Sequence, residues 1–531
     1  MPAQLTGIGL DETIYLRSER SIRSEFSAGD RFLELNGPRA LWQLKLARWM
    51  CVPFSLLGAW TCYRWSRDLF GEAAGFAALL LWCFSPAVLG HGTLITADVA
   101  SASFFVATCY AFRNWLLRPS WRSCATLGVF LGTALLVKFT CLLLFAILGL
   151  LSVCSVLFPF AVPPGSGTGT SAGSEVDSHL ANSPGRRLRT GQLALAFALA
   201  MFLVNLGFGF EGTGTRLRDY NFVSQALAGP HDTVPPDAPE RRTSLWMYGN
   251  RFRDQWVGRL PVPIPVYYLR GIDIQKKDFE APRPSYLFGK WKSGGWWYYY
   301  LAGALVKLPV GTLLLIFVGL LQAARGVSRC HPVDEFLLIV PMLAVLGVCS
   351  AQTNMSHHLR YCLPALPFLF ISISRGVSVP GAFRNVAAAA VVGMLLSSLW
   401  VFPNSLSFFN LAAGGPENGK RYLLHSNLDW GQNFLFLKDW MAGHPEARPL
   451  ILHDHAIYEP RHLGLDVLKP TRRPTPGWHA VTSDVLCGGA NDSGWPVWLL
   501  DEEPVAVVGY SVHIFHVTQE QADAATREYF R

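Results

Sequence analysis

Long apolar stretches dominate the pattern of hydrophobic and polar positions along the chain. They reach membrane-spanning length at roughly 44–63, 73–90, 98–116, 123–138, 141–160, 192–209, 298–322, 334–350, 361–375 and 383–402. A helix needs about 17 to 25 apolar residues to cross the hydrocarbon core of a bilayer. The pattern therefore predicts an α-helical polytopic membrane protein with about ten spans.

Basic residues in the connections between these stretches predict how the spans are oriented. They gather in every second connection, as Arg64 and Arg67, then Arg113, Arg118 and Arg122, then Arg186, Arg187 and Arg189, then Arg325 and Arg329, then Arg375 and Arg384. Cytoplasmic loops carry the excess of Lys and Arg. We therefore expect these connections, with the Gly/Ser-rich linker 161–191, in the cytoplasm. The outer loop 210–297 and the C-terminal part then face the periplasm across an inner membrane.

The first 40 residues do not fit this orientation. Ten spans with an outward C-terminus require an outward N-terminus, yet residues 1–40 have no apolar run, no signal peptide and many charges. An additional span upstream of Met1, the eleventh, restores the parity. The sequence thus predicts an N-terminally truncated reading frame in which residues 1–40 are a remnant of the first outer loop.

The pattern changes after Phe402. Alternating runs predict strands at 420–426, 448–453, 478–482 and 505–515, and helices at 432–442 and 519–529. Strand, helix and strand in this order favour a small α/β fold. We expect a membrane domain over 41–402 and a periplasmic α/β domain over 403–531, which serves as an accessory module without its own active site.

The composition supports a membrane protein and excludes several function classes. Hydrophobic residues make up 51% of the chain and charged residues 15%, against about 25% in a typical soluble domain. The net charge is +8 without a long basic run, which argues against a nucleic-acid partner. No CxxC, P-loop, HExxH or GxSxG pattern occurs, so the sequence predicts no zinc site and no common ATPase or hydrolase signature.

Ionisable groups at the edges of spans are costly to bury and usually functional. Asp98 opens an apolar helix, where a helix cap and a catalytic or metal-ligand role both fit. Lys138 ends a span and either snorkels to the interface or meets a phosphate. His357, His358 and Arg360 precede a span and suit a phosphate leaving group, with interfacial anchoring as the alternative.

Several stretches carry a resemblance to a known family. LARWMCVPFSLLGAW, LWCFSPAVLGHGTLITAD, GGWWYYYLAGALVKLPVG, HHLRYCLPALPFLF and SNLDWGQNFLFLKDW are among them. The chain resembles the dolichyl-phosphate-mannose–protein mannosyltransferase-like glycosyltransferases of family 39, which have the C-type membrane glycosyltransferase (GT-C) fold. More narrowly, it resembles a subgroup found in planctomycetes. The resemblance runs from about Leu41 to the end of the chain.

The resemblance implies an enzyme that transfers a hexosyl or pentosyl group from a polyprenyl-phosphate donor to an acceptor, with inversion, on the outer face of the membrane. Such a mannosyltransferase-like enzyme acts in glycosylation of a protein, lipid or glycan acceptor. The resemblance gives no certain cofactor and leaves a divalent cation as an open alternative. The sequence names neither the sugar nor the acceptor.

The same resemblance implies roles for individual residues. Family members use an acidic pair in the first outer loop as the general base, and here only Asp11 and Glu12 offer such a pair, without the expected preceding span. Asp98 corresponds to a second acidic position. The expected contacts of the donor phosphate are Lys138, His357, His358 and Arg360. A non-catalytic polyprenyl-lipid binding or transport protein, or an inactive truncated remnant, is the alternative function.

Overall fold

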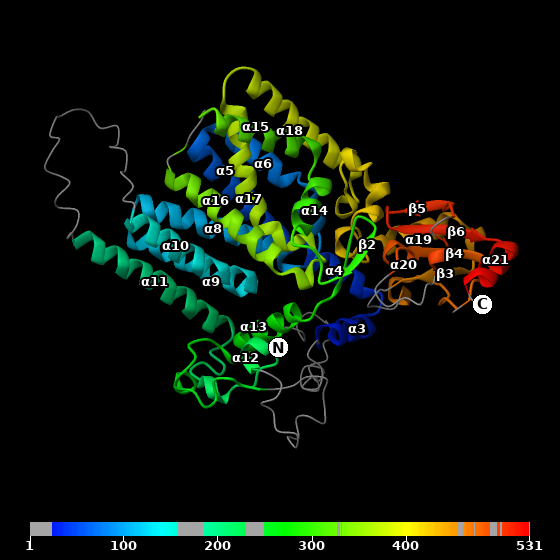
Figure 1. Cartoon of the computed structure of the whole chain (residues 1–531), viewed down its shortest axis with the longest axis horizontal. Helices are drawn as coiled ribbons and strands as arrows, with labels where there is room; N and C mark the ends of the chain where they lie inside the picture. Colours follow the sequence, from blue (N-terminus) through cyan, green and yellow to red (C-terminus); the bar gives the residue numbers. More distant parts are fainter. Residues whose placement is uncertain are drawn as a thin grey trace.

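The computed structural model describes residues 24–157, 184–229, 249–326, 330, 332–454, 460–471, 473–488, 496–499 and 502–529. Figure 1 shows a body of long helices with a smaller sheet-containing part beside it. The helices of the body are α3 (Ser24–Asn36), α4 (Arg39–Trp49), α5 (Val52–Phe70), α6 (Glu72–Cys83), α7 (Pro86–Gly92), α8 (Ala97–Leu117), α9 (Trp121–Val137), α10 (Leu143–Leu157), α11 (Pro184–Gly207), α12 (Gln225–Ala228), α13 (Val266–Glu280), α14 (Tyr299–Lys307), α15 (Val310–Ala324), α16 (Pro332–Ala351), α17 (Leu366–Ser374) and α18 (Ala382–Val401).

Several of these helices are long and apolar enough to cross a membrane. Within the described residues, four meet the length and hydropathy of a span, at Arg189–Gly207, Pro332–Ala351, Leu359–Ser378 and Ala382–Val401. Two bent helix pairs bring the number to six if each pair is one span. The prediction of a polytopic helical membrane protein is therefore supported. The count of ten spans stays a prediction, although each of the ten predicted stretches overlaps a helix.

The predicted span at 298–322 is not one continuous helix, because α14 and α15 meet at an angle of 114°. Leu308 and Pro309 between them are extended, with ψ of 135° and 144°. Proline cannot donate the next helical hydrogen bond and pushes the residue before it out of the helical region. The predicted span at 73–90 bends by 51° between α6 and α7 for the same reason, at Ser85–Pro86.

The predicted first span also begins later than expected. The helix starts at Val52 instead of near residue 44, and α4 before it is a separate helix that ends at Trp49. Pro53 occupies the first turn of α5, where its missing N–H costs no hydrogen bond. The apolar residues of α4 instead serve another contact, since Leu41 packs against the core of the C-terminal sheet.

Close helix packing in the body depends on small residues. A Cβ at Gly132 of α9 would lie 2.9 Å from Leu203 of α11, and one at Gly311 of α15 would lie 2.1 Å from the carbonyl oxygen of Ala390 in α18. Small residues at such positions let membrane helices approach closely. A buried ion pair adds a polar link, because Arg113 of α8 and Asp334 of α16 lie 2.5 Å apart.

The C-terminal part contains a four-stranded sheet in the order β3-β4-β6-β5. Its elements are α19 (Asn433–Gly443), β3 (Leu450–His453), β4 (Gly477–Thr482), α20 (Ser483–Leu486), β5 (Ala506–Val508), β6 (Val512–Val517) and α21 (Gln519–Tyr529), while β1 (Pro284–Leu287) and β2 (Lys290–Ser293) form a separate hairpin. β3 runs parallel to β4, and the other pairs are antiparallel. The predicted strands at 448–453 and 478–482 and both predicted helices are confirmed.

Two strand predictions in this part need correction. Residues 420–426 form no strand: the first and last of them belong to 3₁₀ turns at Pro416–Arg421 and His425–Asn427, and 422–424 connect these turns. The apolar residues of this segment suggested a strand, but they serve a different contact. Leu423 packs into the core of the helical body instead of a sheet. The predicted strand 505–515 is a hairpin, since Gly509 and Tyr510 take positive φ values of 60° and 66° and turn the chain between β5 and β6.

Candidate functional site

Asp98 lies in the first turn of α8, where its side chain is only 4% exposed. The N-cap residue of this helix is Thr96, so Asp98 is not the cap. Its carboxylate accepts a hydrogen bond from Lys138 Nζ at 2.5 Å, and Arg360 Nη1 lies 3.7 Å from its other oxygen. Three of the residues selected from the sequence therefore meet at one point, although they come from three separate segments of the chain.

Aromatic rings hold the two cations of this cluster. The Lys138 ammonium lies 5.3 Å from the ring centroid of Tyr361, and the Arg360 guanidinium lies 3.8 Å from that of Trp430. A cation over an aromatic face is attracted by the quadrupole of the ring. Two cations share the single carboxylate of Asp98, so the cluster has a surplus positive charge that an anion could complement.

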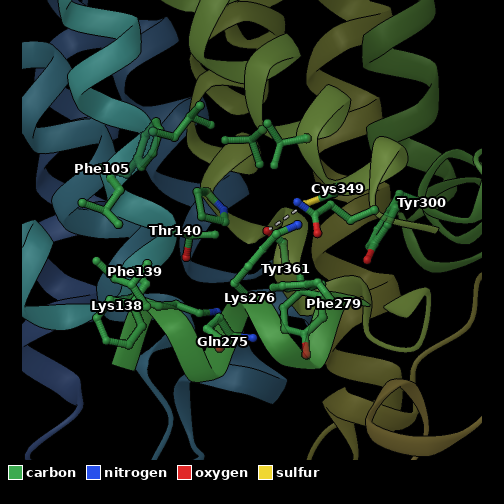
Figure 2. A pocket seen from close by; sticks show the side chains of 17 residues that line it. Phe105, Lys138, Phe139, Thr140, Gln275, Lys276, Phe279, Tyr300, Cys349 and Tyr361 are labelled. Carbon is green, nitrogen blue, oxygen red and sulfur yellow. Dashed lines mark hydrogen bonds between the residues drawn. The ribbon is translucent and has the colours of Figure 1, made fainter. Parts of the chain in front are cut away.

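A largely apolar cavity of about 360 Å³ opens on one side of the cluster. Lys138 and Tyr361 line it together with residues of α8, α10, α13 and α16 (Figure 2). Gln275, Lys276 and Phe279 of α13 close one side of it, which brings part of the predicted outer loop into the site. None of the described residues that line this cavity is acidic. We call it the Lys138 cavity.

A second apolar cavity of about 350 Å³ is lined by Arg360 of the same cluster. Its walls come from α7, α14, α15, α16, the 3₁₀ segment Leu359–Ala365, α17 and the turns around 405–408 and 427. Its basic side chains are His91, Lys307 and Arg360, and Tyr300 lines both cavities. We call it the Lys307 cavity. Asp98 is thus paired with one cation from each cavity.

His357 and His358 point to the C-terminal part of the chain. His358 Nδ1 lies 2.7 Å from the hydroxyl of Ser426, and the ring centroid of His357 lies 5.5 Å from that of His425. Burial, with the nearby charges of His425 and Arg283, lowers the pKa of His357 to about 4. The structure therefore joins these imidazoles to residues 425 and 426 and gives them no hydrogen bond to Asp98 among the described residues.

Sequence reasoning missed His425, which pairs with Asp484. The Asp484 carboxylate accepts the backbone N–H of His425 at 2.8 Å and lies 3.3 Å from its Nδ1. Burial alone would lower the pKa of His425, but the hydrogen bond and charge of Asp484 outweigh burial and raise it. Nothing in the local sequence signals this pair, because its members are 59 residues apart.

Asp429 and Trp430 of the SNLDWGQ stretch also lie at this junction. Asp429 accepts the N–H of Gly431 at 2.8 Å and the hydroxyl of Ser511, while the N-cap of α19 is Gln432. Burial, with the charge of Asp484, raises the pKa of Asp429 to about 6 against the opposing hydrogen bond of Ser511. Asp11 and Glu12, the predicted acidic pair, lie outside the described residues.

No group of three or more His, Cys, Asp or Glu is placed to hold a metal ion in the parts of the chain that the structure describes. The positive surplus around Asp98 favours an anion there instead. The geometry can hold a phosphate between Lys138 and Arg360 and keep a carboxylate beside it. Such an arrangement suits the departure of a phosphate and the deprotonation of a hydroxyl group.

The fold and the site define a helical membrane protein with a buried carboxylate that is paired with one cation from each of two apolar cavities. Residues 42–157 match the sequence model of a family described as dolichyl-phosphate-mannose-protein mannosyltransferase. The matched segment includes Asp98 and Lys138. Over this segment the match confirms the resemblance to the family predicted from the sequence, and the narrower resemblance to a planctomycete subgroup stays a prediction.

The solved structures include one with a similar chain, the apo crystal structure of ArnT from Cupriavidus metallidurans. The sequence identity is 14%, and the similarity covers 94% of this chain and 88% of ArnT with a TM-score of 0.37. At this TM-score the two chains share too little geometry for the comparison to inform the site. No curated protein matches the chain.

Proposed function

We propose that the protein is an inverting membrane glycosyltransferase. It moves a hexosyl or pentosyl group from a polyprenyl-phosphate donor to an acceptor on the periplasmic face of the inner membrane. The match of residues 42–157 to a mannosyltransferase family supports the reaction class. The observation that carries the proposal is the buried carboxylate of Asp98, paired with Lys138, which lines one apolar cavity, and with Arg360, which lines another.

In this proposal the donor occupies the Lys138 cavity. Its apolar walls suit a polyprenyl chain, and Lys138 lies where the phosphate would end that chain. Arg360 reaches the same phosphate from the opposite side, through the fork of donors that phosphate oxygens accept. Preorganised donors of this kind each stabilise a developing charge by roughly 2–4 kcal/mol. His357 and His358 extend the polar surface towards residues 425 and 426.

The chemical step is a single displacement at the anomeric carbon. The acceptor oxygen forms the new bond while the bond to the phosphate oxygen breaks, and the phosphate leaves with the electron pair. A carboxylate takes the acceptor proton. Asp98 is released for this task, or for orienting the acceptor, when the donor phosphate competes for Lys138 and Arg360. Asp11 and Glu12 keep their proposed role as the acidic pair of the family.

The decisive experiment measures consumption of a polyprenyl-phosphate hexose by the purified full-length protein. We expect Asp98→Asn to fold normally and to lose most turnover, since the charge is lost while the shape remains. The matched control is Asp219→Asn, an exposed carboxylate of the outer loop with a 54% exposed side chain. Turnover in Asp98→Asn equal to that of the wild type would refute the role of Asp98. Donor binding without consumption by any variant or the wild type would favour a lipid-binding protein.

A further inference from the structure

Helix α4 carries apolar residues on two of its sides. Leu41 and Leu44 line a pocket shared with the C-terminal part, and Leu41 also packs against the core of the sheet. Another side is an exposed face formed by Trp42, Leu46 and Trp49, with exposed fractions of 55%, 41% and 62%. The helix has 11 residues, too few to cross a bilayer, which takes about 17 to 25. A short helix with such an exposed apolar face is typical of one that lies along a membrane surface.

The exposed face of α4 continues onto the surface of the helical body. Met50 directly after α4 is 70% exposed, and Leu56 and Trp60 of α5 are 60% and 50% exposed. The ring centroids of Trp42 and Trp49 lie 6.0 Å apart in an edge-to-face pair. Tryptophan is enriched where membrane proteins meet the lipid head groups. These features indicate that α4 lies at the head-group level, beside the beginning of the predicted first span.

A pocket of about 260 Å³ lies between α4 and the start of α19. Figure 1 shows α3 and α4 next to the sheet-containing part of the chain, which closes the pocket from the other side. None of the described residues that line it also lines the Lys138 cavity or the Lys307 cavity. We call it the Arg48 pocket. Trp430 forms part of its wall and also lies 3.8 Å from the guanidinium of Arg360.

Two cations of α4 line the Arg48 pocket. They are Lys45, which is exposed, and Arg48, which is partly buried. Within the described part of the chain, neither side chain is in an ion pair or a hydrogen bond. None of the described lining residues is acidic, and Asp429 close by is bonded to Gly431 and Ser511 instead. The pocket therefore has an uncompensated positive charge.

Gln432 adds a buried hydrogen-bond donor to the same pocket. Its Oε1 accepts the backbone N–H of Trp430 at 2.7 Å, which leaves Nε2 as the other end of the amide. Nε2 is buried and has no hydrogen-bond partner among the described residues. Buried polar groups in native proteins almost always have a partner. A donor without a partner beside two cations calls for a ligand that accepts hydrogen bonds and carries negative charge.

We propose that the Arg48 pocket binds the phosphate of an anionic phospholipid of the bilayer. The pocket is too small for a whole phospholipid, so it takes only the head group. Lys45 lies three residues from both Trp42 and Arg48, so it stands between the exposed face of α4 and the pocket, and the acyl chains can follow that face into the membrane. The inference goes beyond the proposed function and does not depend on it. A bound lipid would also fix the Trp430 ring that stacks on Arg360.

The test measures lipid binding to the purified full-length protein by titration in native mass spectrometry. The probes are phosphatidylglycerol and zwitterionic phosphatidylcholine, and we expect phosphatidylglycerol to be preferred. The double variant Lys45→Gln, Arg48→Gln should weaken phosphatidylglycerol binding by about 5-fold for each cation removed and leave phosphatidylcholine binding unchanged. The matched control is Lys290→Gln, Arg384→Gln, which removes two exposed cations elsewhere on the chain and should bind as the wild type does.

A second variant tests the pocket without removing a cation. Gln432→Glu keeps the oxygen that accepts the N–H of Trp430 but places a negative charge in the pocket, so it should also weaken phosphatidylglycerol binding. Wild-type affinity for phosphatidylglycerol in both pocket variants would overturn the inference. An equal loss of affinity in the control pair would overturn it too, because the preference would then reflect the charge of the whole surface.

Two competition experiments identify the occupant. A large excess of inorganic phosphate should not displace phosphatidylglycerol, since the acyl chains contribute to binding. Saturating decaprenyl phosphate should not displace it either, because the proposed donor site shares no described lining residue with this pocket. Displacement by inorganic phosphate would show that the pocket takes a soluble anion, and displacement by decaprenyl phosphate that it takes the polyprenyl lipid. Either result would overturn the assignment to a phospholipid.

Discussion

Replacing Arg360 by lysine is the most informative perturbation of the proposed phosphate contact. Arg360 Nη1 lies 3.7 Å from Asp98, and the central carbon of its guanidinium lies 3.8 Å from the ring centroid of Trp430. Lysine keeps the positive charge but loses the planar fork and the stacking surface. The variant therefore separates the geometry of the arginine from its charge.

The expected magnitude follows from these two contacts. A hydrogen bond to a charged group contributes about 1.5–3 kcal/mol, and a partly buried cation–π contact contributes about 0.5–2 kcal/mol. Arg360→Lys should lose part of both, which corresponds to a decrease in donor affinity of roughly 10- to 100-fold. Arg360→Ala should lose at least as much. Trp430→Leu, which removes only the stacking, should weaken donor binding by about 2- to 30-fold.

The assay is the binding of decaprenyl phosphate to the detergent-solubilised protein, measured by isothermal titration calorimetry. Arg384→Lys is the matched control, because Arg384 is an exposed arginine at the start of α18. We expect the control to bind as the wild type does. If Arg360→Ala bound decaprenyl phosphate as tightly as the wild type, Arg360 would not contact the donor phosphate and the reasoning from its position would fail.

Three further predictions concern stability. Arg113→Met should destabilise the protein by about 3–5 kcal/mol, because it leaves the carboxylate of Asp334 buried without its partner. The double variant with Asp334→Leu should recover much of this loss. Chemical denaturation measures both free energies of unfolding, and no recovery in the double variant would contradict the prediction. Gly311→Ala should lower the melting temperature because its Cβ meets a backbone oxygen at 2.1 Å, while Gly393→Ala in α18 has open space and should not. The raised pKa of Asp429, about 6, means that the folded protein holds this proton more tightly than the unfolded chain, so stability should fall as the pH rises from about 4 towards 7. Asp429→Asn should flatten that decline in thermal unfolding at a series of pH values, and an unchanged decline would exclude Asp429 as its source.

Much of the helical body could be predicted from the sequence, because apolar length is a strong signal for membrane helices. The bends could not be placed by the same signal. The 114° turn at Pro309 lies inside a continuous apolar stretch, and hydropathy is insensitive to backbone direction. For the same reason Lys307 seemed to be a residue of a span, although the turn places its ammonium against Leu406 and Asn427.

Part of the candidate site could also be predicted, because an ionisable residue in an apolar context is rare. Asp98, Lys138 and Arg360 were selected on this ground and lie together in the structure. The contribution of the C-terminal part could not be predicted. Trp430 and His425 reach the site through contacts between distant segments, and the apolar pattern around 420–426 was mistaken for a strand.

The central claim is that a polyprenyl phosphate binds beside Asp98, and a structure of the protein with bound decaprenyl phosphate tests it most directly. The account predicts the phosphate within hydrogen-bonding distance of Lys138 and Arg360, with the isoprene units next to it in the 360 Å³ cavity and Asp98 released from Lys138. A phosphate bound away from both cations, with the Asp98–Lys138 hydrogen bond intact, would contradict the account.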